Sequence, residues 1–176
     1  IAIDLADVAR ALAPDGRDPG LTAEGWYETP HMNYPYGVHL AVVRVDRDTG
    51  ATVVERFLIA YDVGRAINPM LVEGQLAGGF AQGLGGALYE EFKYDANGQP
   101  LAVTLADYLI PTEREVPPGE VLISEDAPSP LNPLGIKGAG EGGVPGTGAA
   151  IAAAIDDAIG TAGAVTQLAV TAVRLL

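Results

Sequence analysis

The 176-residue sequence contains no cysteine. This absence excludes disulfide bonds, thiolate metal sites and a cysteine nucleophile, and it suits the cytoplasmic location that we expect. Basic residues are also few, because 10 Lys and Arg stand against 23 Asp and Glu and give a formal net charge of −13. This charge argues against nucleic acid or an anionic membrane surface as a partner.

Targeting and membrane signals are missing as well. No basic segment followed by an apolar run opens the chain, so we predict no signal peptide. The apolar stretch 69–91 is interrupted by Glu73 and two glutamines, which argues against a membrane span. His31 and His39 have no acidic residue at metal-ligand spacing, so we interpret both as structural. The chain begins at Ile1 rather than Met, and we interpret it as a piece of something longer or a processed subunit.

Apolar residues make up 48% of the chain, enough for the core of one domain or two small ones. Strand pairs followed by helices, without regular β–α alternation, predict an α+β fold with a mixed or antiparallel sheet and packed helices. Residues 1–20 are expected to form a leading helix and linker, and residues 21–176 the main domain. The expected elements are helices at 1–12, 69–91 and 149–159, hairpin strands at 37–45 and 52–63, further strands at 90–94, 101–109 and 120–124, and a strand plus a last helical turn at 165–176.

The stretch Lys137–Gly148 is the most distinctive in the chain. Six of its twelve residues are glycine, and Glu141 is its only carboxylate. Glycine suits backbone that takes positive φ or comes close to a ligand. The stretch leads into the helical pattern at 149–159, and a helix N-terminus favours anionic ligands. The alternative is a flexible surface loop.

A second glycine-rich element spans 69–91. Apolar residues recur every four positions on one side of this expected helix, at Val72, Leu76, Phe80, Leu84 and Leu88. Six glycines interrupt it, and each costs about 1 kcal/mol relative to alanine inside a helix. Such a helix must gain close backbone packing, a ligand contact, or both. Gln75 and Gln82 lie seven residues apart on one face, and their amides can donate and accept hydrogen bonds.

Residues Gly138–Gly143 also match the dinucleotide-binding pattern G-x-G-x-x-G, with Asp156 following 18 residues after Gly138. That pattern normally follows a buried strand and opens a helix. Here a proline-rich connector precedes it, and Pro145 stands where the helix should begin. A dinucleotide-binding module is therefore the alternative function, beside a non-catalytic structural subunit.

Three motifs in order resemble the C-terminal part of the molybdenum-binding large subunit of molybdenum hydroxylases. They are Asp62-Val-Gly-Arg-Ala-Ile-Asn-Pro-Met-Leu-Val-Glu-Gly-Gln75, Asp107-Tyr-Leu-Ile-Pro111 and Lys137-Gly-Ala-Gly-Glu141. The family includes xanthine dehydrogenases, aldehyde oxidoreductases and aerobic carbon monoxide dehydrogenases. The resemblance extends over most of the chain, and Gly142-Gly143 after the glutamate is similar to the carbon monoxide dehydrogenase-like branch.

The resemblance implies an oxidoreductase that hydroxylates a small substrate, such as an N-heterocycle or an aldehyde, with oxygen derived from water. It implies that Glu141 is the active-site base and that Gln75 contacts the pterin cofactor. Residues lining the same pocket would be Gly74, Lys137, Gly138, Ala139 and Gly140.

The implied cofactor is a molybdenum–pterin, either molybdopterin or molybdopterin cytosine dinucleotide. Its dithiolene holds the metal, so a chain without cysteine can still line the site. Family large subunits are several times longer than this chain, and iron–sulfur cysteines and a flavin motif are missing here. We therefore expect activity only in a hetero-oligomer with the remaining part of the molybdenum subunit, an FAD subunit and a [2Fe–2S] subunit.

Overall fold

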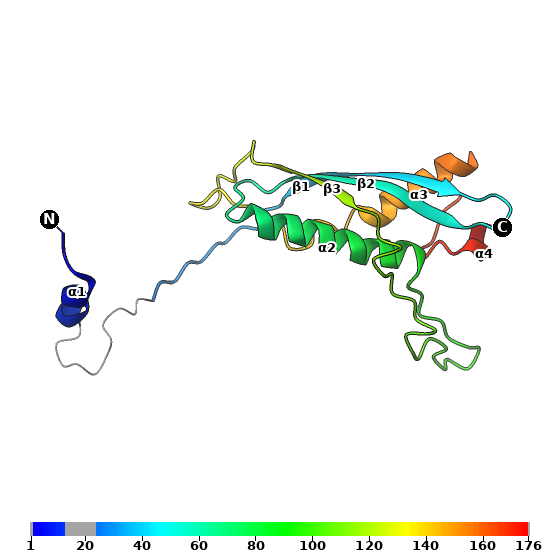
Figure 1. Cartoon of the computed structure of the whole chain (residues 1–176), viewed down its shortest axis with the longest axis horizontal. Coiled ribbons are helices and arrows are strands. Elements are labelled where there is room, and N and C mark those ends of the chain that lie inside the picture. Colours follow the sequence, from blue (N-terminus) through cyan, green and yellow to red (C-terminus); the bar gives the residue numbers. More distant parts are fainter. Residues whose placement is uncertain (1, 13–23, 176) are drawn as a thin grey trace. The chain divides into compact units, whose positions relative to one another are not determined.

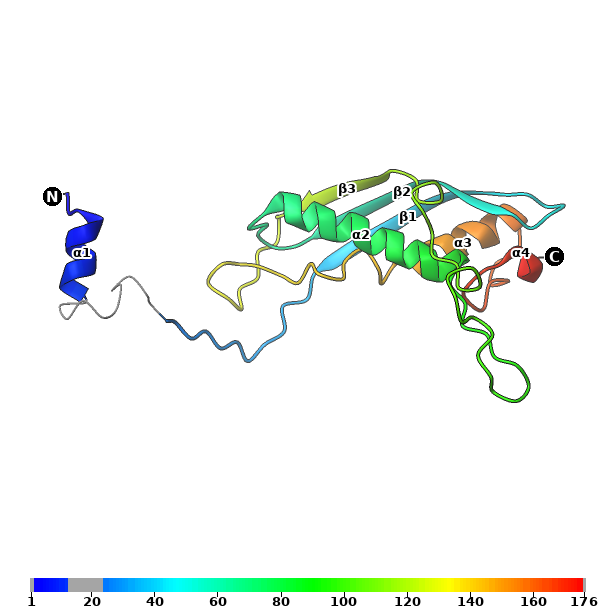
Figure 2. The ribbon, with the colours of Figure 1, turned by 60° about the horizontal axis from the view of Figure 1, so that its bottom comes forward.

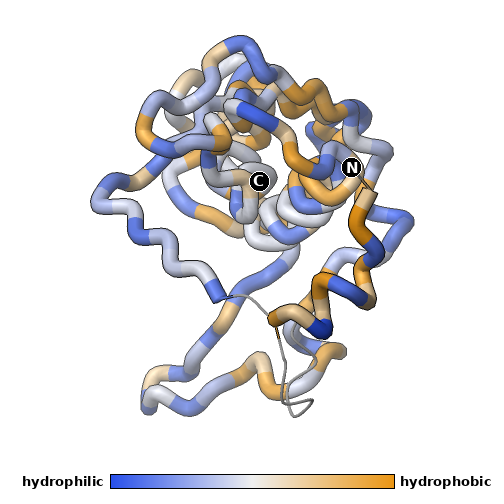
Figure 3. Tube along the Cα trace, turned by 90° about the vertical axis from the view of Figure 1, so that its left-hand side faces the viewer, coloured by the Kyte–Doolittle hydropathy of each residue, from blue (hydrophilic) through white to orange (hydrophobic). Residues whose placement is uncertain are grey.

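The computed structural model describes residues 2–12 and 24–175. The chain separates into two units, Ile1–Pro30 and His31–Leu176. The first unit contains helix α1 (Leu5–Leu12), which has no buried residue. Hydrophobic and hydrophilic residues are interleaved along it (Figure 3). The turn-rich part of the predicted linker, Pro14–Gly20, lies outside the described residues.

The second unit is built on a mixed three-stranded sheet with the order β1-β2-β3 (Figure 1). Strand β1 (Tyr36–Val45) pairs antiparallel with β2 (Thr52–Asp62), and β2 pairs parallel with β3 (Gly119–Ser124). The turn of the β1–β2 hairpin is closed by the Asp46 carboxylate, which accepts the backbone N–H groups of residues 48 and 49 at 2.9 Å. The predicted hairpin and mixed sheet are confirmed.

Two helices cover one face of this sheet (Figure 2). Helix α2 (Pro69–Leu88) begins at Asn68, whose side chain accepts the N–H of Leu71 at 3.2 Å and so caps the helix. Helix α3 (Thr147–Ile159) ends at Gly160 in the left-handed conformation, φ 76°. The core between helices and sheet contains Phe57, Ile59, Tyr61, Val63, Leu76, Phe80, Leu84, Ile151 and Ile155.

The predicted strands at 90–94 and 101–109 are wrong. Only one isolated bridge, Tyr94 to Pro100, joins these runs. The turn between them does form, because the Asp95 carboxylate accepts the backbone N–H of residues 97 and 99 and Gly98 adopts φ 80°. The segment extends away from the end of α2 (Figure 2). No further strand in the described chain pairs with it.

The C-terminal prediction is half right. The last helical turn is present as α4 (Ala172–Leu175), but no strand forms within the described part of 165–176. Helix α2 stops three residues before its predicted end, since Tyr89 caps it through a backbone bond to Gly85. The α+β fold class is confirmed. In the described ranges, no helix is long and apolar enough to cross a membrane.

Candidate functional site

The loop before α3 packs against α2 through direct backbone contact. Gly142 and Gly143 are buried. A Cβ added to Gly142 would lie 2.6 Å from both Leu76 and Tyr61, and one added to Gly79 would lie 2.8 Å from the Cα of Gly143. Side chains therefore cannot be accommodated on either side of this contact. Close backbone packing thus accounts for part of the glycine content of α2, as the sequence predicts.

A polar cluster holds the same loop from the sheet side. His39, which lies on β1, places Nε2 3.1 Å from the carbonyl oxygen of Gly142 and Nδ1 3.3 Å from Thr147 Oγ1. The Thr147 hydroxyl donates to the Gly143 carbonyl at 2.6 Å. Burial lowers the pKa of His39, and the bond to the Gly142 carbonyl opposes that effect. His39 thus joins β1 to the loop, a contact of which the sequence gives no sign.

A cleft of about 360 Å³ opens between α2 and the loop. Its lining residues are Gln75, Gly78, Gly79, Gln82, Gly140, Glu141, Val144 and Pro145. The amide of Gln75 donates to the Gly140 carbonyl at 3.1 Å and so bridges the two walls. Glu141 is exposed. Both glutamines face this cleft, as their shared helix face predicts.

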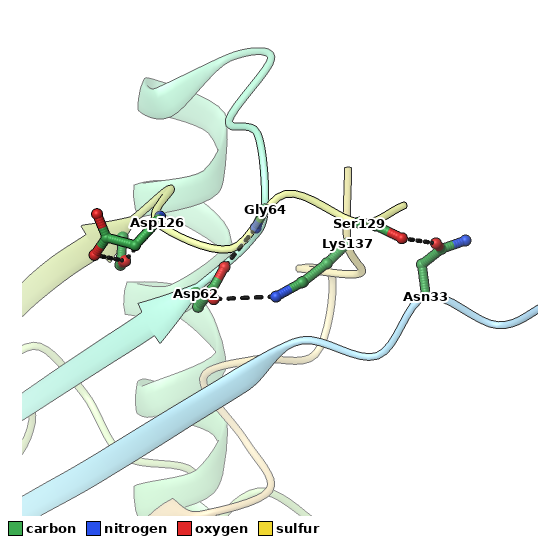
Figure 4. Close-up of polar contacts among 7 residues, drawn as sticks. Asn33, Asp62, Gly64, Asp126, Ser129 and Lys137 are labelled. Atoms are coloured by element: carbon green, nitrogen blue, oxygen red, sulfur yellow. Dashed lines mark hydrogen bonds and ion pairs between the residues drawn. The ribbon is translucent and has the colours of Figure 1, made fainter. Parts of the chain in front are cut away.

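Lys137 is held by an ion pair at the start of the loop. Its Nζ lies 3.0 Å from Asp62 Oδ2, and the two side chains are only 8% and 19% exposed (Figure 4). The backbone N–H of Gly64 is the main cause of the lowered pKa of Asp62, and Lys137 contributes to the same shift. The ammonium group also lies 5.1 Å from the ring centre of Tyr36. The structure therefore uses Lys137 to join the loop to the end of β2.

The connector before the loop is fixed by amide side chains. Asn33 accepts hydrogen bonds from the Ser129 hydroxyl (Figure 4) and from the Asn132 amide, the latter at 3.0 Å. Asn132 also exchanges bonds with both backbone groups of Ile136, at 2.8 and 3.0 Å. The Asn33 carbonyl accepts the Gly138 N–H at 2.9 Å. No motif in the sequence points to these residues. Asn132 lies among prolines, which lack a backbone N–H donor. An asparagine in such a segment is the signal that could have identified it.

The predicted site residues therefore lie in three places. Gln75, Gly140 and Glu141 line one cleft. Gly74 precedes Gln75 on α2, and a Cβ there would meet nothing within 4 Å. Lys137, Gly138 and Ala139 lead into the loop: Lys137 pairs with Asp62, the Gly138 N–H bonds to Asn33, and Ala139 packs against the core.

The geometry disfavours a dinucleotide-binding module. No strand leads directly into Gly138, and the N–H groups of Gly138 and Gly142 are taken by the carbonyls of Asn33 and Ala139. Helix α3 begins only at Thr147, beyond Pro145. In the dinucleotide pattern the glycines join a strand directly to the helix whose N-terminus binds the pyrophosphate, and that arrangement is absent from this described segment.

Comparisons with known proteins point in one direction. The family model described as "Molybdopterin cofactor-binding domain" matches residues 2–117. The chain is 48% identical over 162 residues to the 6-hydroxypseudooxynicotine dehydrogenase complex subunit gamma of Paenarthrobacter nicotinovorans, covering 89% of this chain and 20% of the relative. It is 41% identical over 165 residues to the carbon monoxide dehydrogenase large chain of Hydrogenophaga pseudoflava, covering 94% and 20%.

Solved structures give the same result. A Cu,Mo-CO dehydrogenase superposes with a TM-score of 0.85 at 35% identity, covering 97% of this chain and 22% of that one. Quinoline 2-oxidoreductase from Pseudomonas putida 86 superposes with a TM-score of 0.74 at 43% identity, covering 79% and 18%. The chain thus spans about a fifth of the length of these relatives. The resemblance to molybdenum hydroxylase large subunits is confirmed, and the chain belongs to the molybdopterin cofactor-binding domain family.

Proposed function

We propose that this chain is the C-terminal part of the catalytic subunit of a multi-chain molybdenum hydroxylase, with Glu141 as its active-site base. The observation that carries the proposal is the cleft between α2 and the loop. It brings Glu141 together with Gln75 and a wall of glycine backbone, although Gln75 and Gly140, which are hydrogen-bonded across it, lie 65 residues apart in sequence. The chain's membership of a molybdopterin-binding family supports it.

The residues present fit a pterin cofactor. The cleft offers backbone at Gly78, Gly79 and Gly140, where a ligand can approach closely, and side-chain amides at Gln75 and Gln82. A Cβ at Gly78 would meet nothing within 4 Å. That position is open to a bound group, although no contact within the chain requires glycine there. Gln75 and Gln82 would hold the cofactor, which when bound would supply the two-electron redox chemistry of hydroxylation.

Glu141 is placed to move a proton in this reaction. Its carboxylate is exposed at the cleft, while the two residues after it are buried under α2. A fixed backbone with a free carboxylate suits a general base, which must reach the proton it accepts. Glu141 would take the proton from the water-derived oxygen as that oxygen attacks an electron-poor carbon, and the two electrons of the broken C–H bond would leave with its hydrogen to the bound cofactor. The loop would hold the carboxylate in position between turnovers.

The substrate we propose is a small electron-poor compound, either an N-heterocycle or an aldehyde. An N-heterocycle is the stronger candidate, since two relatives are named for quinoline and for a nicotine derivative. Partner chains carrying FAD and [2Fe–2S] clusters would take the electrons, in an assembly with the remaining part of the molybdenum subunit. A cytoplasmic location stays a prediction of the sequence.

Replacing Glu141 by Gln in the assembled enzyme tests the proposal. This variant keeps the size and hydrogen bonding of the side chain but removes its basicity. Assembly and molybdenum content should survive, while turnover falls by at least about 10²-fold, as expected for the loss of a general base. Asp157→Asn, an equal charge change at an exposed position of α3, is the matched control and should leave turnover unchanged. Near-normal turnover of Glu141→Gln with full metal loading would exclude Glu141 as the base.

A non-catalytic structural subunit is the second candidate. The exposed carboxylate and the open cleft favour catalysis instead, because a purely structural chain has no need of either. Molybdenum analysis of the purified assembly separates the two. Metal near stoichiometry supports the hydroxylase, and its absence from a correctly matured assembly supports the structural role.

A further inference from the structure

The position of the Glu141 carboxylate depends on backbone contacts. In the described chain its side chain accepts no hydrogen bond and forms no ion pair, and its own carbonyl accepts the Val144 N–H at 3.0 Å. The residues that follow are Gly142 and Gly143, which have no side chain to hold them in place. The location of the carboxylate is therefore set by whatever fixes the backbone of these two glycines.

Two side chains from distant elements bind those two residues. His39 Nε2 lies 3.1 Å from the Gly142 carbonyl, and the Thr147 hydroxyl donates to the Gly143 carbonyl at 2.6 Å. Both glycines are buried, so water does not replace these donors readily. A buried carbonyl that loses its donor carries the full cost of desolvation. The loop would therefore shift to recover a partner.

The available protons assign one carbonyl to each donor. A carbonyl oxygen only accepts, so His39 must carry a hydrogen on Nε2 to bond to Gly142. Thr147 has one hydroxyl proton, and the 2.6 Å contact directs it to the Gly143 carbonyl. The remaining His39 nitrogen, Nδ1, lies 3.3 Å from the same hydroxyl oxygen. A neutral imidazole has its one N–H on Nε2, so no proton is left to join Nδ1 to that oxygen, and each donor holds its own carbonyl.

The His39 ring is itself held in one orientation. It packs edge-on against Phe57, with ring centres 5.8 Å apart. The ring also lies against Gly146, where an added Cβ would come within 2.8 Å of the ring carbons. The ring therefore fills the space between the core and the loop, and its nitrogens reach the loop without freedom to rotate.

From this geometry we infer that His39 and Thr147 are positioning residues for Glu141: they fix the Gly142 and Gly143 carbonyls and thereby hold the carboxylate at the cleft. The inference rests on the proposed role of Glu141 as a base. It assigns no contact between His39 and substrate or cofactor. Its consequence is that loss of these donors lowers the rate of the proton-transfer step without preventing the cofactor from binding.

The experiment uses the assembled, molybdenum-loaded enzyme with paired variants. Thr147→Val keeps the shape of the side chain but removes the hydroxyl, and Thr147→Ser restores it. His39→Phe keeps a ring of similar size but removes both nitrogens, and His39→Gln retains an amide donor near the position of Nε2. Arg47→Met is the matched control, because it removes a comparable long-range bond, 2.9 Å to the Ala158 carbonyl, far from this loop.

Three readouts are needed: molybdenum content, hydrogen–deuterium exchange of the peptide covering 139–147, and kcat and KM separately. For Thr147→Val and His39→Phe we expect unchanged metal content, faster exchange in that peptide, unchanged KM and a kcat lowered about 10- to 100-fold, the scale of a misplaced catalytic group. Thr147→Ser and His39→Gln should recover most of the kcat. Arg47→Met should leave kcat at the wild-type value.

The outcomes separate this inference from the proposed function. If Thr147→Val and His39→Phe keep wild-type kcat while Glu141→Gln loses turnover, the positioning role is wrong and Glu141 remains the base. If Thr147→Ser fails to recover kcat, or Arg47→Met loses as much, the contacts are merely structural and the inference is overturned. If Glu141→Gln itself retains turnover, the proposed role of Glu141 fails first.

Discussion

Gly78 offers a direct test of whether the cleft receives a cofactor. It lies inside α2, where glycine costs about 1 kcal/mol relative to alanine. A Cβ at this position would meet nothing within 4 Å in the chain, yet Gly78 lines the cleft. Gly86 on the same helix has the same open surroundings and does not line the cleft. The two positions therefore form a matched pair that differs in access to the site.

Alanine at either position should stabilise α2. A gain of up to about 1 kcal/mol corresponds to roughly fivefold slower hydrogen exchange in the helix. Gly86 lies in the last turn, so its gain should be the smaller of the two. Neither substitution needs any neighbour to move, which predicts that both variants fold and assemble. This stability measurement is the control for the next step.

Leucine at the same positions should give different results. Gly78→Leu would place a side chain in the cleft of about 360 Å³ and compete with the bound group. We expect molybdenum and pterin content to fall several-fold below those of Gly86→Leu, with α2 equally protected in both. Metal analysis and pterin release from the purified assembly measure this difference. Wild-type loading of Gly78→Leu would show that the cofactor does not occupy this cleft, and equal loss in both variants would point to packing against another part of the assembly.

Three further results are expected. Lys137→Met removes the ammonium from a carboxylate that is only 19% exposed and leaves it the Gly64 N–H as donor, so the free energy of local opening of 137–147 should fall by about 1.5–3 kcal/mol. Lys93→Met removes an ammonium that is 60% exposed, and its partner Glu91 keeps its pair with Arg174, so the cost should be less than about 1 kcal/mol; equal effects would contradict this reasoning. Burial lowers the pKa of His39 below its ordinary 6.5 in the folded chain. As the pH falls, the imidazole is therefore protonated in the unfolded chain before it is protonated in the folded one, which lowers the free energy of unfolding. Protection of the loop from hydrogen exchange should therefore be constant above pH 6.5 and decline below it, and His39→Gln should remove this part of the decline. Gln75→Ala should lower cofactor content more than Gln82→Ala, since only Gln75 also bridges the cleft walls; identical losses would count against that assignment.

The elements that could be predicted are those determined by local chemistry. Asp46 and Gly50 specify the β1–β2 turn through a side-chain acceptor and a positive φ of 70°. Asn68 before Pro69 specifies the start of α2, because the asparagine side chain caps the helix and proline is well suited to the first helical position. Such signals lie within a few residues of the feature they create. The ends of these elements were accordingly predicted to within about three residues.

The wrong strands at 90–109 show where local chemistry is insufficient. The turn at Asp95–Gly98 forms as predicted, but a strand also needs a neighbour to satisfy its backbone groups. Residues such as Leu101, Val103 and Leu105 are exposed, between 53% and 73%. An alternating apolar pattern indicates that a segment is suited to packing, but it does not indicate which surface the segment packs against.

The site also contains a contact that local sequence does not predict. Motif resemblance places Gln75 and Glu141 at one site, and the structure shows them in one cleft. The contact between His39 and Gly142 joins residues 103 positions apart, and no spacing or periodicity in the sequence connects them. A single histidine on a strand gives no indication of which of its two faces meets a polar partner. Only the register of β1 beneath the loop decides it.

The glycines of α2 differ in their surroundings, and the differences indicate how the site is built. In the sequence they are equivalent, because each weakens the helix by a similar amount. In the structure Gly79 and Gly83 meet the loop at Gly143 and Thr147, whereas Gly74 and Gly78 have nothing within 4 Å. Gly79 and Gly83 therefore let the loop pack closely against the helix, and Gly78 lines the open part of the cleft. Substitution at Gly79 or Gly83 should displace Glu141, the proposed base, whereas substitution at Gly78 should displace the proposed ligand.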